Sequence, residues 1–378
     1  MIILNIELDN IYMFNNTFFD FTYSKKRTNS TINNEYLEEF PNINFKRVNI
    51  LMGANASGKT SFGKVLRDLL NYLSGRNIEH LSYIINNKSK SANIKLTYIL
   101  PDKKTINSIE VFYDSENIKK EIFKSIELKK SWSLKIALEK LKNSKPIFDY
   151  DINNKNEDIL NPGLKSIAVS KGVELISPNT QWYFQFSDGG DYSLNFRNQN
   201  IELLNRVLKN FDNSIDNIKL IEDDTYLIKF KNNDLVIVEK GKMINKERLS
   251  RGTQEAIEVS SFLNAIINLN KNESGTFYLD EKMAYSHSEI EIAIVNLIIE
   301  KLNKYSQFFY TTHNYDLLEI NLPTHSFLFL KKENNEIKVV YPEKLKYTKN
   351  DRSLLNYVKN DVFGTLPSTH LIEELLYE

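Results

Sequence analysis

Short apolar runs separated by polar, asparagine-rich stretches occupy much of the chain and predict a fold built around β-sheets. Near the N-terminus, Ile2 to Leu8 and Thr17 to Tyr23 have the alternating or apolar-rich pattern of strands. The polar stretch from Ser24 to Asn44 is expected to be a loop. Val48 to Met52 resembles a buried strand, and a helix is predicted from Lys59 to about Leu70, after a glycine-containing turn.

Two further pairs of apolar runs predict β-hairpins. Ala92 to Leu100 and Ser108 to Tyr113 flank the turn-forming residues Pro101 to Lys104. Ile218 to Lys229 and Asp234 to Glu239 flank another polar turn. We therefore expect an antiparallel layer beside the core that contains the first strand–turn–helix unit.

The segment from Glu116 to Lys145 is predicted to be helical and strongly basic, with nine lysines against four glutamates. Its proposed apolar stripe consists of Ile118, Ile122, Phe123, Ile126, Leu134, Leu138 and Leu141. Two interpretations stay open for this arm: a solvated basic face, or a surface for nucleic acid or an acidic partner. A polar linker is expected from Asp149 to Gly163.

The second half of the chain predicts helices and two apolar strands that end in polar residues. Leu203 to Phe211 is expected to be helical, and Ser250 is a good N-cap for a helix that reaches Ile267. The strands are Thr276 to Glu281 and Gln307 to Asn314. The remaining predictions are a hairpin around Glu333, Asn334 and Asn335 and two small helices, Ser353 to Tyr357 and His370 to Leu376.

Composition narrows the class of protein. The 378 residues suffice for two or three lobes, and 49 basic residues balance 49 acidic ones, which argues against coating nucleic acid by bulk charge. Without cysteine, the chain has no disulfides, zinc–cysteine sites or thiol catalysis. The N-terminus lacks the basic region of a signal peptide, and no apolar run approaches a membrane span. We expect a soluble cytoplasmic protein that does not contact a membrane.

The stretch between the first buried strand and its helix has the spacing of a phosphate-binding P-loop, with Gly53 followed after four residues by Gly58, Lys59 and Thr60. Backbone N–H groups of such a loop surround a triphosphate, while the lysine reaches the β- and γ-phosphates and the threonine hydroxyl reaches Mg²⁺. ATP and Mg²⁺ are the expected ligands. The predicted loop residues are Gly53, Ala54, Asn55, Ala56, Ser57, Gly58, Lys59, Thr60 and Ser61.

Three later positions complete a candidate ATP site. Ser250, Arg251 and Gly252 lie at a helix N-terminus, a second place for an anion, although such a helix start is ordinary by itself. Asp280 is placed to hold Mg²⁺, and Glu281 to orient and polarise the attacking water. His313, at the end of the next strand, can hydrogen-bond the γ-phosphate and respond to its loss.

These motifs resemble ABC-type ATPase heads of the SMC/RecF kind, and especially the compact prokaryotic members related to the ATPase half of OLD nucleases and to anti-phage defence ATPases. GANASGKT is similar to their Walker A, LSRGTQ to their signature motif, LDE to Walker B and TTH to the switch histidine. EKMAYSHSE resembles a D-loop, with His287 at the position of the family histidine. The resemblance implies that Ser250, Arg251, Gly252, Gln254 and His287 contact nucleotide, that Thr60 and Asp280 hold the metal, and that Lys59, Glu281 and His313 are catalytic.

Some residues depart from the family pattern. Arg251 replaces the second glycine of the transporter-type signature, and Lys282 stands where a proline often follows Walker B. Gln181 and Gln185 are weak candidates for the Q-loop glutamine. Arg251 is either a trans-acting positive charge or a solvated arginine.

The resemblance implies an α/β fold: an ABC-type P-loop ATPase head with a mixed central sheet, an antiparallel β layer and a helical signature lobe. Residues 1–115 and 270–345 would form the ATP-binding core lobe, residues 116–269 a helical arm and signature lobe, and residues 346–378 a C-terminal helical tail. The five histidines (His80, His287, His313, His325 and His370) have no metal-ligand spacing, and Glu222, Asp223 and Asp224 lack a partner acidic run.

With no second catalytic centre visible, the resemblance implies a Mg²⁺-dependent ATPase that forms a homodimer around ATP. Such an ATPase would regulate a separate effector, a nuclease or toxin, in bacterial anti-phage defence. The alternative is a RecF- or SMC-like DNA-binding head in repair or chromosome maintenance. A transporter ATPase subunit is disfavoured by the missing Q-loop and the lysine-rich arm.

Overall fold

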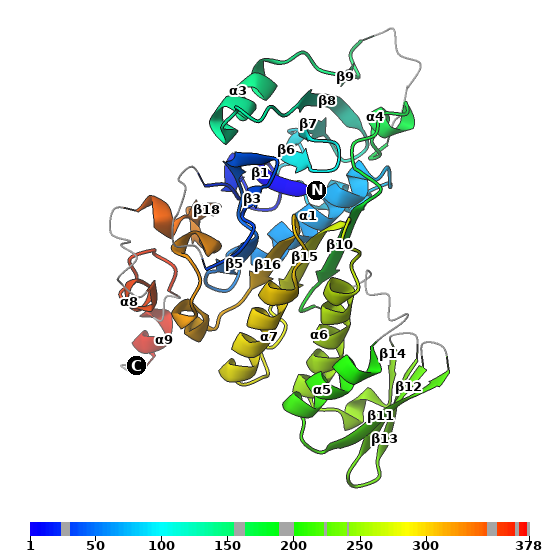
Figure 1. Ribbon diagram of the computed structural model, residues 1–378. Coiled ribbons are helices and arrows are strands. Elements are labelled where there is room, and N and C mark those ends of the chain that lie inside the picture. The colour runs from blue at the N-terminus through cyan, green and yellow to red at the C-terminus, as the bar shows by residue number, and fades with distance from the viewer. Residues whose placement is uncertain are drawn as a thin grey trace. The chain divides into compact units, whose positions relative to one another are not determined.

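The computed structural model describes residues 1–23, 31–154, 163–188, 200–222, 225–239, 242–345, 354–366 and 370–375 (Figure 1). The chain forms two compact units. We call Ile2–Ser177 with Leu318–Glu378 the P-loop unit, and Met1 with Pro178–Leu317 the signature unit. No helix among the described residues is long and apolar enough to cross a membrane.

An antiparallel sheet forms one part of the P-loop unit, and its strand order is β2-β1-β6-β7-β8-β9. The strands are β1 (Ile2–Asp9), β2 (Thr17–Asp20), β6 (Ala92–Leu100), β7 (Thr105–Tyr113), β8 (Ile118–Glu127) and β9 (Phe148–Asp151). The predicted hairpin around Pro101 is confirmed as β6 and β7, in register from Ala92↔Tyr113 to Leu100↔Thr105.

A second sheet segment of this unit carries the P-loop. Strand β5 (Val48–Met52) is buried at all five positions and pairs in parallel with β17 (Phe327–Glu333). β18 (Glu336–Val340) pairs antiparallel with β17, which confirms the hairpin predicted around Glu333, Asn334 and Asn335. Helix α1 (Lys59–Leu73) follows the loop, and its Phe62 ring stacks on Phe19 of β2 at 4.2 Å between centroids. The predicted strand–turn–helix order is therefore confirmed.

A buried polar cluster lies directly before β5. The main-chain N–H of Arg47 donates to Glu35 Oε1 at 3.3 Å, and its guanidinium donates to the carbonyl of Asn33 at 2.5 Å. Glu35 Oε2 meets His325 Nε2 at 2.8 Å, and the Tyr23 ring stacks on that imidazole. Burial lowers the pKa of Arg47 from its usual value. The cluster joins the residue that precedes β5 to the turn that precedes β17.

The prediction of a helical arm from Glu116 to Lys145 was wrong in its first half. Residues 118–127 form β8, which pairs with β7, and only Leu134–Asn143 is helical (α3), beside β8 in Figure 1. Ile118, Glu121 and Phe123 are the inward-facing residues. The isoleucines fit a helical stripe as well as a strand, and pairing with β7 decides between them. Glu121 obscured the alternation of apolar and polar residues that is typical of a strand, because a charged residue occupies a buried position. Its carboxylate accepts hydrogen bonds there instead of being solvated.

Other parts of the P-loop unit are short. The predicted loop Ser24 to Asn44 contains the small hairpin β3 (Tyr36–Leu37) and β4 (Phe40–Asn44), while residues 24–30 lie outside the described part. The remaining elements are α2 (His80–Tyr83), α4 (Ile167–Ser170), α8 (Leu354–Lys359) and α9 (His370–Glu374), with 3₁₀ turns at Thr324–Ser326 and Pro342–Lys344. The two predicted tail helices correspond to α8 and α9. The predicted linker from Asp149 to Gly163 was wrong at its start, because Phe148–Asp151 forms β9 and pairs with β8, and residues 155–162 lie outside the described part.

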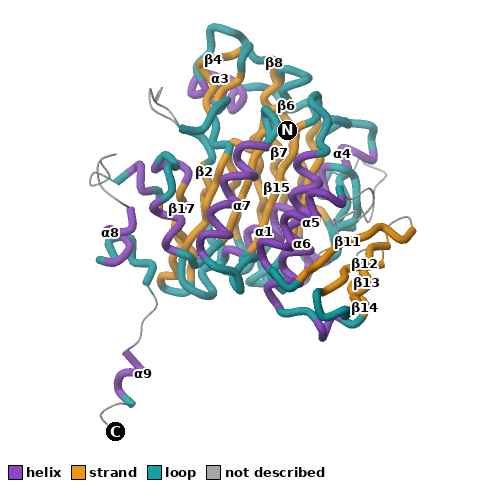
Figure 2. The backbone as a smooth tube through the Cα atoms, turned by 60° about the horizontal axis from the view of Figure 1, so that its bottom comes forward, coloured by secondary structure: helices purple, strands orange, loops and turns teal. Residues whose placement is uncertain are grey.

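The signature unit is built on three parallel strands. These are β10 (Thr180–Gln185), β15 (Ser274–Asp280) and β16 (Gln307–Thr311), in that spatial order. Helices α6 (Arg251–Ile267) and α7 (Ser288–Lys301) run alongside them (Figure 2), and a 3₁₀ turn follows at Tyr315–Glu319. The ring of Phe262 on α6 packs against Phe277 of β15 and Phe308 of β16.

A four-stranded antiparallel sheet completes the signature unit. Its strands are β11 (Ile215–Glu222), β12 (Thr225–Phe230), β13 (Leu235–Glu239) and β14 (Lys242–Ile244), followed by a 3₁₀ turn at Lys246–Arg248. With α5 (Ile201–Phe211) and α6 it encloses an apolar core that includes Leu208, Ile228 and Ala256. The predicted hairpin is confirmed as β12 and β13, but Ile218 to Lys229 forms two strands rather than one, and Asp223 and Asp224 lie outside the described residues.

The α/β class with a mixed sheet, an antiparallel layer and a signature lobe is confirmed, although the lobe expected to be helical also contains a sheet. The compact units divide at Ser177 and Leu317, whereas the predicted lobes divide near residues 115 and 270. The predicted boundaries of the ATP-binding core lobe, the arm and signature lobe, and the tail stay a proposal.

Candidate functional site

Two glycines shape the P-loop, because neither could carry a side chain without a collision. Gly53 has φ 151°, and a Cβ atom there would lie 2.2 Å from the carbonyl oxygen of Leu330. Gly58 has φ 96°, and its Cβ would lie 2.3 Å from Ile337 Cδ1. A left-handed backbone and close approach are the two conditions that favour glycine. Strands β17 and β18 therefore hold the loop tightly from one side.

The loop lysine is buried in position. Lys59 is 4% exposed, and its ammonium donates to the carbonyls of Gly53 at 3.0 Å and Ala54 at 3.3 Å. Asn55 and Ala56 form the exposed crown of the loop, where Ala56 has a left-handed φ of 59°. The hydroxyl of Ser57 is buried and has no hydrogen-bond partner among the described residues, so it can donate to a ligand in the loop.

The residues that follow Lys59 open α1. Thr60 and Ser61 are half-buried in its first turn, and Gly58 at the N-cap gives no side-chain hydrogen bond to the helix. The first N–H groups of such a helix are donors for an anion. The predicted Walker A residues thus form the loop and the first turn of α1 within the P-loop unit, and their contact with phosphate stays a prediction.

Asp280 ends β15 in the signature unit and is fully buried. Thr311, its register partner on β16, donates its hydroxyl to Asp280 Oδ1 at 2.7 Å, and the hydroxyl of Ser187 donates to Oδ2 at 3.1 Å. The carboxyl ends of parallel strands meet at one edge of a sheet, which brings the Walker B and switch segments together. A buried carboxylate fixed by two hydroxyls is a suitable oxygen ligand for Mg²⁺.

Glu281 and His313 form a direct pair at the same edge. His313 Nε2 lies 2.8 Å from Glu281 Oε1, and both side chains retain access to solvent. The main-chain N–H of Glu281 donates to the carbonyl and hydroxyl oxygens of Thr311, each at 3.0 Å. Glu281 has φ 46°, a left-handed conformation that is costly for a residue with a side chain. The predicted catalytic glutamate and switch histidine are therefore neighbours.

The segment LSRGTQ leads into α6, and the predicted N-cap at Ser250 is confirmed, while its role as a signature motif stays a prediction. Ser250 Oγ accepts the N–H of Thr253 at 3.1 Å and lies 2.7 Å from its hydroxyl, which donates to Asp212 Oδ2 at 3.0 Å. A Cβ at Gly252 would lie 3.2 Å from the carbonyl oxygen of Tyr285. Arg251 donates to the hydroxyl of Tyr285 at 2.7 Å and lies over its ring. The start of α6 thus contacts the predicted D-loop.

Two glutamates further along α6 hold the segment after Walker B. Glu255 Oε2 accepts the N–H groups of Met283 at 3.1 Å and Tyr285 at 3.4 Å. Glu258 Oε2 accepts a hydrogen bond from Lys282 Nζ and another from Gln185 Nε2 at 3.3 Å. Burial raises the pKa of Glu255, and the two main-chain hydrogen bonds oppose that shift.

The structure describes four further residues from the sequence analysis, which are two predicted nucleotide contacts and two Q-loop candidates. Gln254 donates from Nε2 to the carbonyls of Lys246 and Leu249, each at 3.0 Å, so its amide nitrogen is engaged within the chain. His287 is exposed at the N-cap of α7. Gln185, the buried Q-loop candidate, bonds Glu258, while Gln181 is half-buried on the same strand β10. Their contacts with nucleotide stay predictions.

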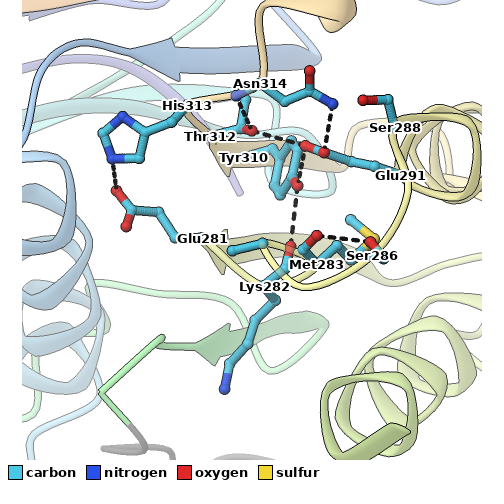
Figure 3. A pocket seen from close by; sticks show the side chains of 11 residues that line it. Glu281, Lys282, Met283, Ser286, Ser288, Glu291, Tyr310, Thr312, His313 and Asn314 are labelled. Atoms are coloured by element: carbon cyan, nitrogen blue, oxygen red, sulfur yellow. Dashed lines mark hydrogen bonds and ion pairs between the residues drawn. The ribbon is translucent and has the colours of Figure 1, made fainter. Parts of the chain in front are cut away.

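A cavity of about 270 Å³ lies beside the Glu281–His313 pair (Figure 3). Its lining comes from the predicted D-loop, from α7 and from the end of β16, and Glu291 lies at its inner side. The lining residues are Glu281, Lys282, Met283, Ala284, Ser286, Ser288, Glu291, Tyr310, Thr312, His313 and Asn314. The cavity gives the pair an open approach within the signature unit.

Residues 48–319 match the sequence profile of a family described as "AAA domain, putative AbiEii toxin, Type IV TA system". The chain belongs to this AAA-domain family. The expected resemblance to a compact ATPase of the AAA and ABC type is thereby confirmed.

Two other comparisons add little to the family assignment of this AAA-domain chain. A solved structure of the recombination mediator protein RecF with ATPrS, in the RecFOR pathway, covers 89% of this chain and 98% of its own at 12% identity, with a TM-score of 0.42. No curated protein matches the sequence.

The sequence motifs did not indicate the residues that hold Asp280, Glu281 and His313 in place. Ser187 and Thr311 fix Asp280, Glu255 and Glu258 hold the D-loop segment, and Glu291 bonds the switch segment. One signal was available. Glu291 lies three, four and seven residues before the buried Ile294, Val295 and Ile298, so a charged residue occupies the apolar stripe of α7.

Proposed function

We propose that this AAA-domain chain binds and hydrolyses Mg²⁺-ATP, and that two copies enclose the nucleotide. One observation carries the proposal: Glu281 and His313 are paired beside the fixed carboxylate of Asp280. Walker A supplies the phosphate cradle and Lys59 the positive charge. Each P-loop would face the signature helix of the other copy, because a γ-phosphate benefits from donors on both sides.

We infer that Thr60 and Asp280 would hold a Mg²⁺ ion. Thr60 offers a hydroxyl and Asp280 a carboxylate, and oxygen ligands of this kind are the ones that Mg²⁺ prefers. Bound Mg²⁺ would neutralise charge on the phosphate oxygens. Glu281 would then orient and deprotonate the attacking water, and His313 would donate a hydrogen bond to the γ-phosphate.

We further propose that the ATP-dependent dimer regulates a separate effector, a nuclease or toxin, in bacterial anti-phage defence. The family description, which refers to a putative toxin of a type IV system, supports a role in such a system. Closing around ATP and opening after hydrolysis provides two states that an effector can distinguish. We expect the effector to be recovered with the chain from its native host.

The DNA-binding alternative depends on the lysines around β8, and most of these are already engaged. Lys119 bridges to Asp114 at 2.6 Å and Lys120 approaches Asp151 at 3.9 Å. Lys124 donates to the carbonyl of Lys142, and Lys129 lies over the ring of Trp132. The carboxylates partly offset the charges of Lys119 and Lys120, whereas Lys124 and Lys129 keep their full positive charge. ATPase activity that DNA stimulates, and that is lost when Lys119, Lys120, Lys124, Lys129 and Lys130 are neutralised, would favour the alternative.

The dimer proposal is tested with Glu281→Gln, which removes the general base but keeps the side-chain shape. Hydrolysis should fall by roughly a hundredfold or more. Light scattering with ATP and Mg²⁺ should show a dimer that the wild type forms only transiently. Glu281→Gln combined with Lys59→Ala is the control and should stay monomeric. ATP binding without any dimer would overturn the two-copy arrangement, while absence of ATP binding in the wild type would overturn the ATPase proposal itself.

A further inference from the structure

Glu291 is a buried carboxylate that the proposed chemistry does not use. It lies on the apolar stripe of α7, is 4% exposed, and lines the inner side of the cavity beside His313. Burying a carboxylate is costly unless hydrogen bonds compensate for lost hydration. We therefore expect hydrogen bonds that compensate for the burial of Glu291 in this stripe.

Those contacts reach both sides of His313. Glu291 Oε1 accepts the hydroxyl of Tyr310 at 2.6 Å and that of Thr312 at 2.8 Å, while Oε2 accepts Asn314 Nδ2 at 2.8 Å (Figure 3). Burial first, and then the charge of Glu291, raise the pKa of Tyr310, so its hydroxyl stays a donor. One carboxylate thus holds three residues of the switch segment.

The same group is connected to the segment that follows Walker B. The Tyr310 hydroxyl lies 3.1 Å from the carbonyl oxygen of Lys282. In this segment, Glu281 and Met283 both have left-handed φ values, 46° and 87°. Residues in such conformations persist where surrounding contacts determine them. Glu255 bonds Met283 from α6, and the Tyr310 hydroxyl of β16, whose hydrogen is shared with Glu291, lies beside the Lys282 carbonyl, so two elements contact the segment.

The cavity beside the switch segment increases the importance of these hydrogen bonds for holding its side chains. The cavity of about 270 Å³ lies against Thr312, His313 and Asn314, so close packing alone does not stop their side chains from moving. We propose that Glu291 is a positioning residue, which holds the segment from Tyr310 to Asn314 so that His313 meets Glu281. The inference rests on the proposed ATPase function for its catalytic consequence, but its geometric content is independent of ATP.

An exchange of charge and amide tests the role of Glu291. In Glu291→Gln, the amide nitrogen would face either Asn314 Nδ2, so that two donors oppose each other, or the hydroxyls of Tyr310 and Thr312, which would lose their acceptor. Each orientation loses hydrogen bonds that the carboxylate makes. Asn314 cannot rotate its amide freely, because Oδ1 accepts the N–H of Asp316 at 3.0 Å. In Asn314→Asp, two carboxylates would face each other. The double variant restores a donor opposite an acceptor, with the roles reversed.

We expect each single variant to lower kcat for ATP by about tenfold or more with little change in KM, because misplacement near the reacting atoms acts on the chemical step. The double variant should recover most of the lost kcat. Glu289→Gln, an exposed glutamate on the same helix, is the matched control and should match the wild type. A kcat for Glu291→Gln equal to that control, or a double variant no better than the worse single, would overturn the positioning role.

A second readout does not need ATP. In ¹⁵N-histidine-labelled protein, the His313 ring signals, assigned with His313→Gln, should shift in both single variants and return in the double variant. Unchanged signals in the single variants would also overturn the inference. If the wild type hydrolyses no ATP, the proposed function fails, while this NMR comparison still decides whether Glu291 positions His313.

Discussion

The P-loop and the Glu281–His313 region are held by different kinds of contact. In the P-loop, Gly53 and Gly58 approach backbone and side-chain atoms so closely that a Cβ atom would collide. Around Glu281 the segment is instead held by side chains from other elements, chiefly the carboxylates of Glu255 and Glu291. The P-loop therefore depends on the absence of a Cβ atom at two glycines, and the Glu281–His313 region depends on hydrogen bonds between side chains and main chain.

This difference determines how each region fails. A collision with backbone cannot be relieved by small rotations, so a single methyl group can remove the phosphate cradle. A hydrogen-bond network loses one contact at a time, and its remaining members limit the damage. Substitutions should therefore act abruptly in the loop and gradually around Glu281.

The largest effect is expected from Gly53→Ala. The new Cβ would lie 2.2 Å from the Leu330 carbonyl oxygen, so β5 or β17 must move. We expect binding of a fluorescent ATP analogue to be lost. Gly172→Ala is the control: it also has a positive φ, 84°, but nothing lies within 4 Å of its Cβ. Equal loss of binding in both variants would contradict the collision explanation, because Gly172 lies outside the P-loop.

An intermediate effect is expected when Glu258 is removed. Lys282 is 5% exposed, and Glu258→Ala leaves its ammonium without that carboxylate. Removing one partner of a buried ion pair costs about 3 kcal/mol, somewhat less here because Glu258 is partly solvated. Urea unfolding should show this loss, and the double variant Glu258→Met with Lys282→Met should recover most of it. Glu300→Ala, exposed on α7, is the control, and an equal result for both would contradict the expectation.

The smallest effect is expected from Glu255→Gln. Because burial raises the pKa of Glu255 above its unfolded value, its charge costs stability at high pH, and this cost fades as pH falls toward the unfolded pKa. An amide oxygen can keep both hydrogen bonds to Met283 and Tyr285. The variant should have a slightly higher Tm than the wild type near pH 7.5, and the difference should shrink toward pH 5. A constant or growing difference would contradict this explanation.

Local signals in the sequence were sufficient where a contact lies within a few residues. The buried strand β5, the helix that follows the glycine turn and the Ser250 cap of α6 are all confirmed. Residues 118–127 were predicted wrongly, because their isoleucines fit both periods and the choice depends on β7. Glu291 was missed because its partners on the switch segment are about twenty residues further along the chain.

The cluster before β5 limits how far the P-loop can be treated as a portable motif. Glu35, Arg47 and His325 come from three separate parts of the chain and are all buried against one another. A chimera that imports residues 48–60 from another ATPase would keep this cluster, whereas one that begins at residue 45 would replace Arg47 and leave Glu35 and His325 behind. Loop exchange between relatives should therefore succeed only when these three positions travel together or stay together.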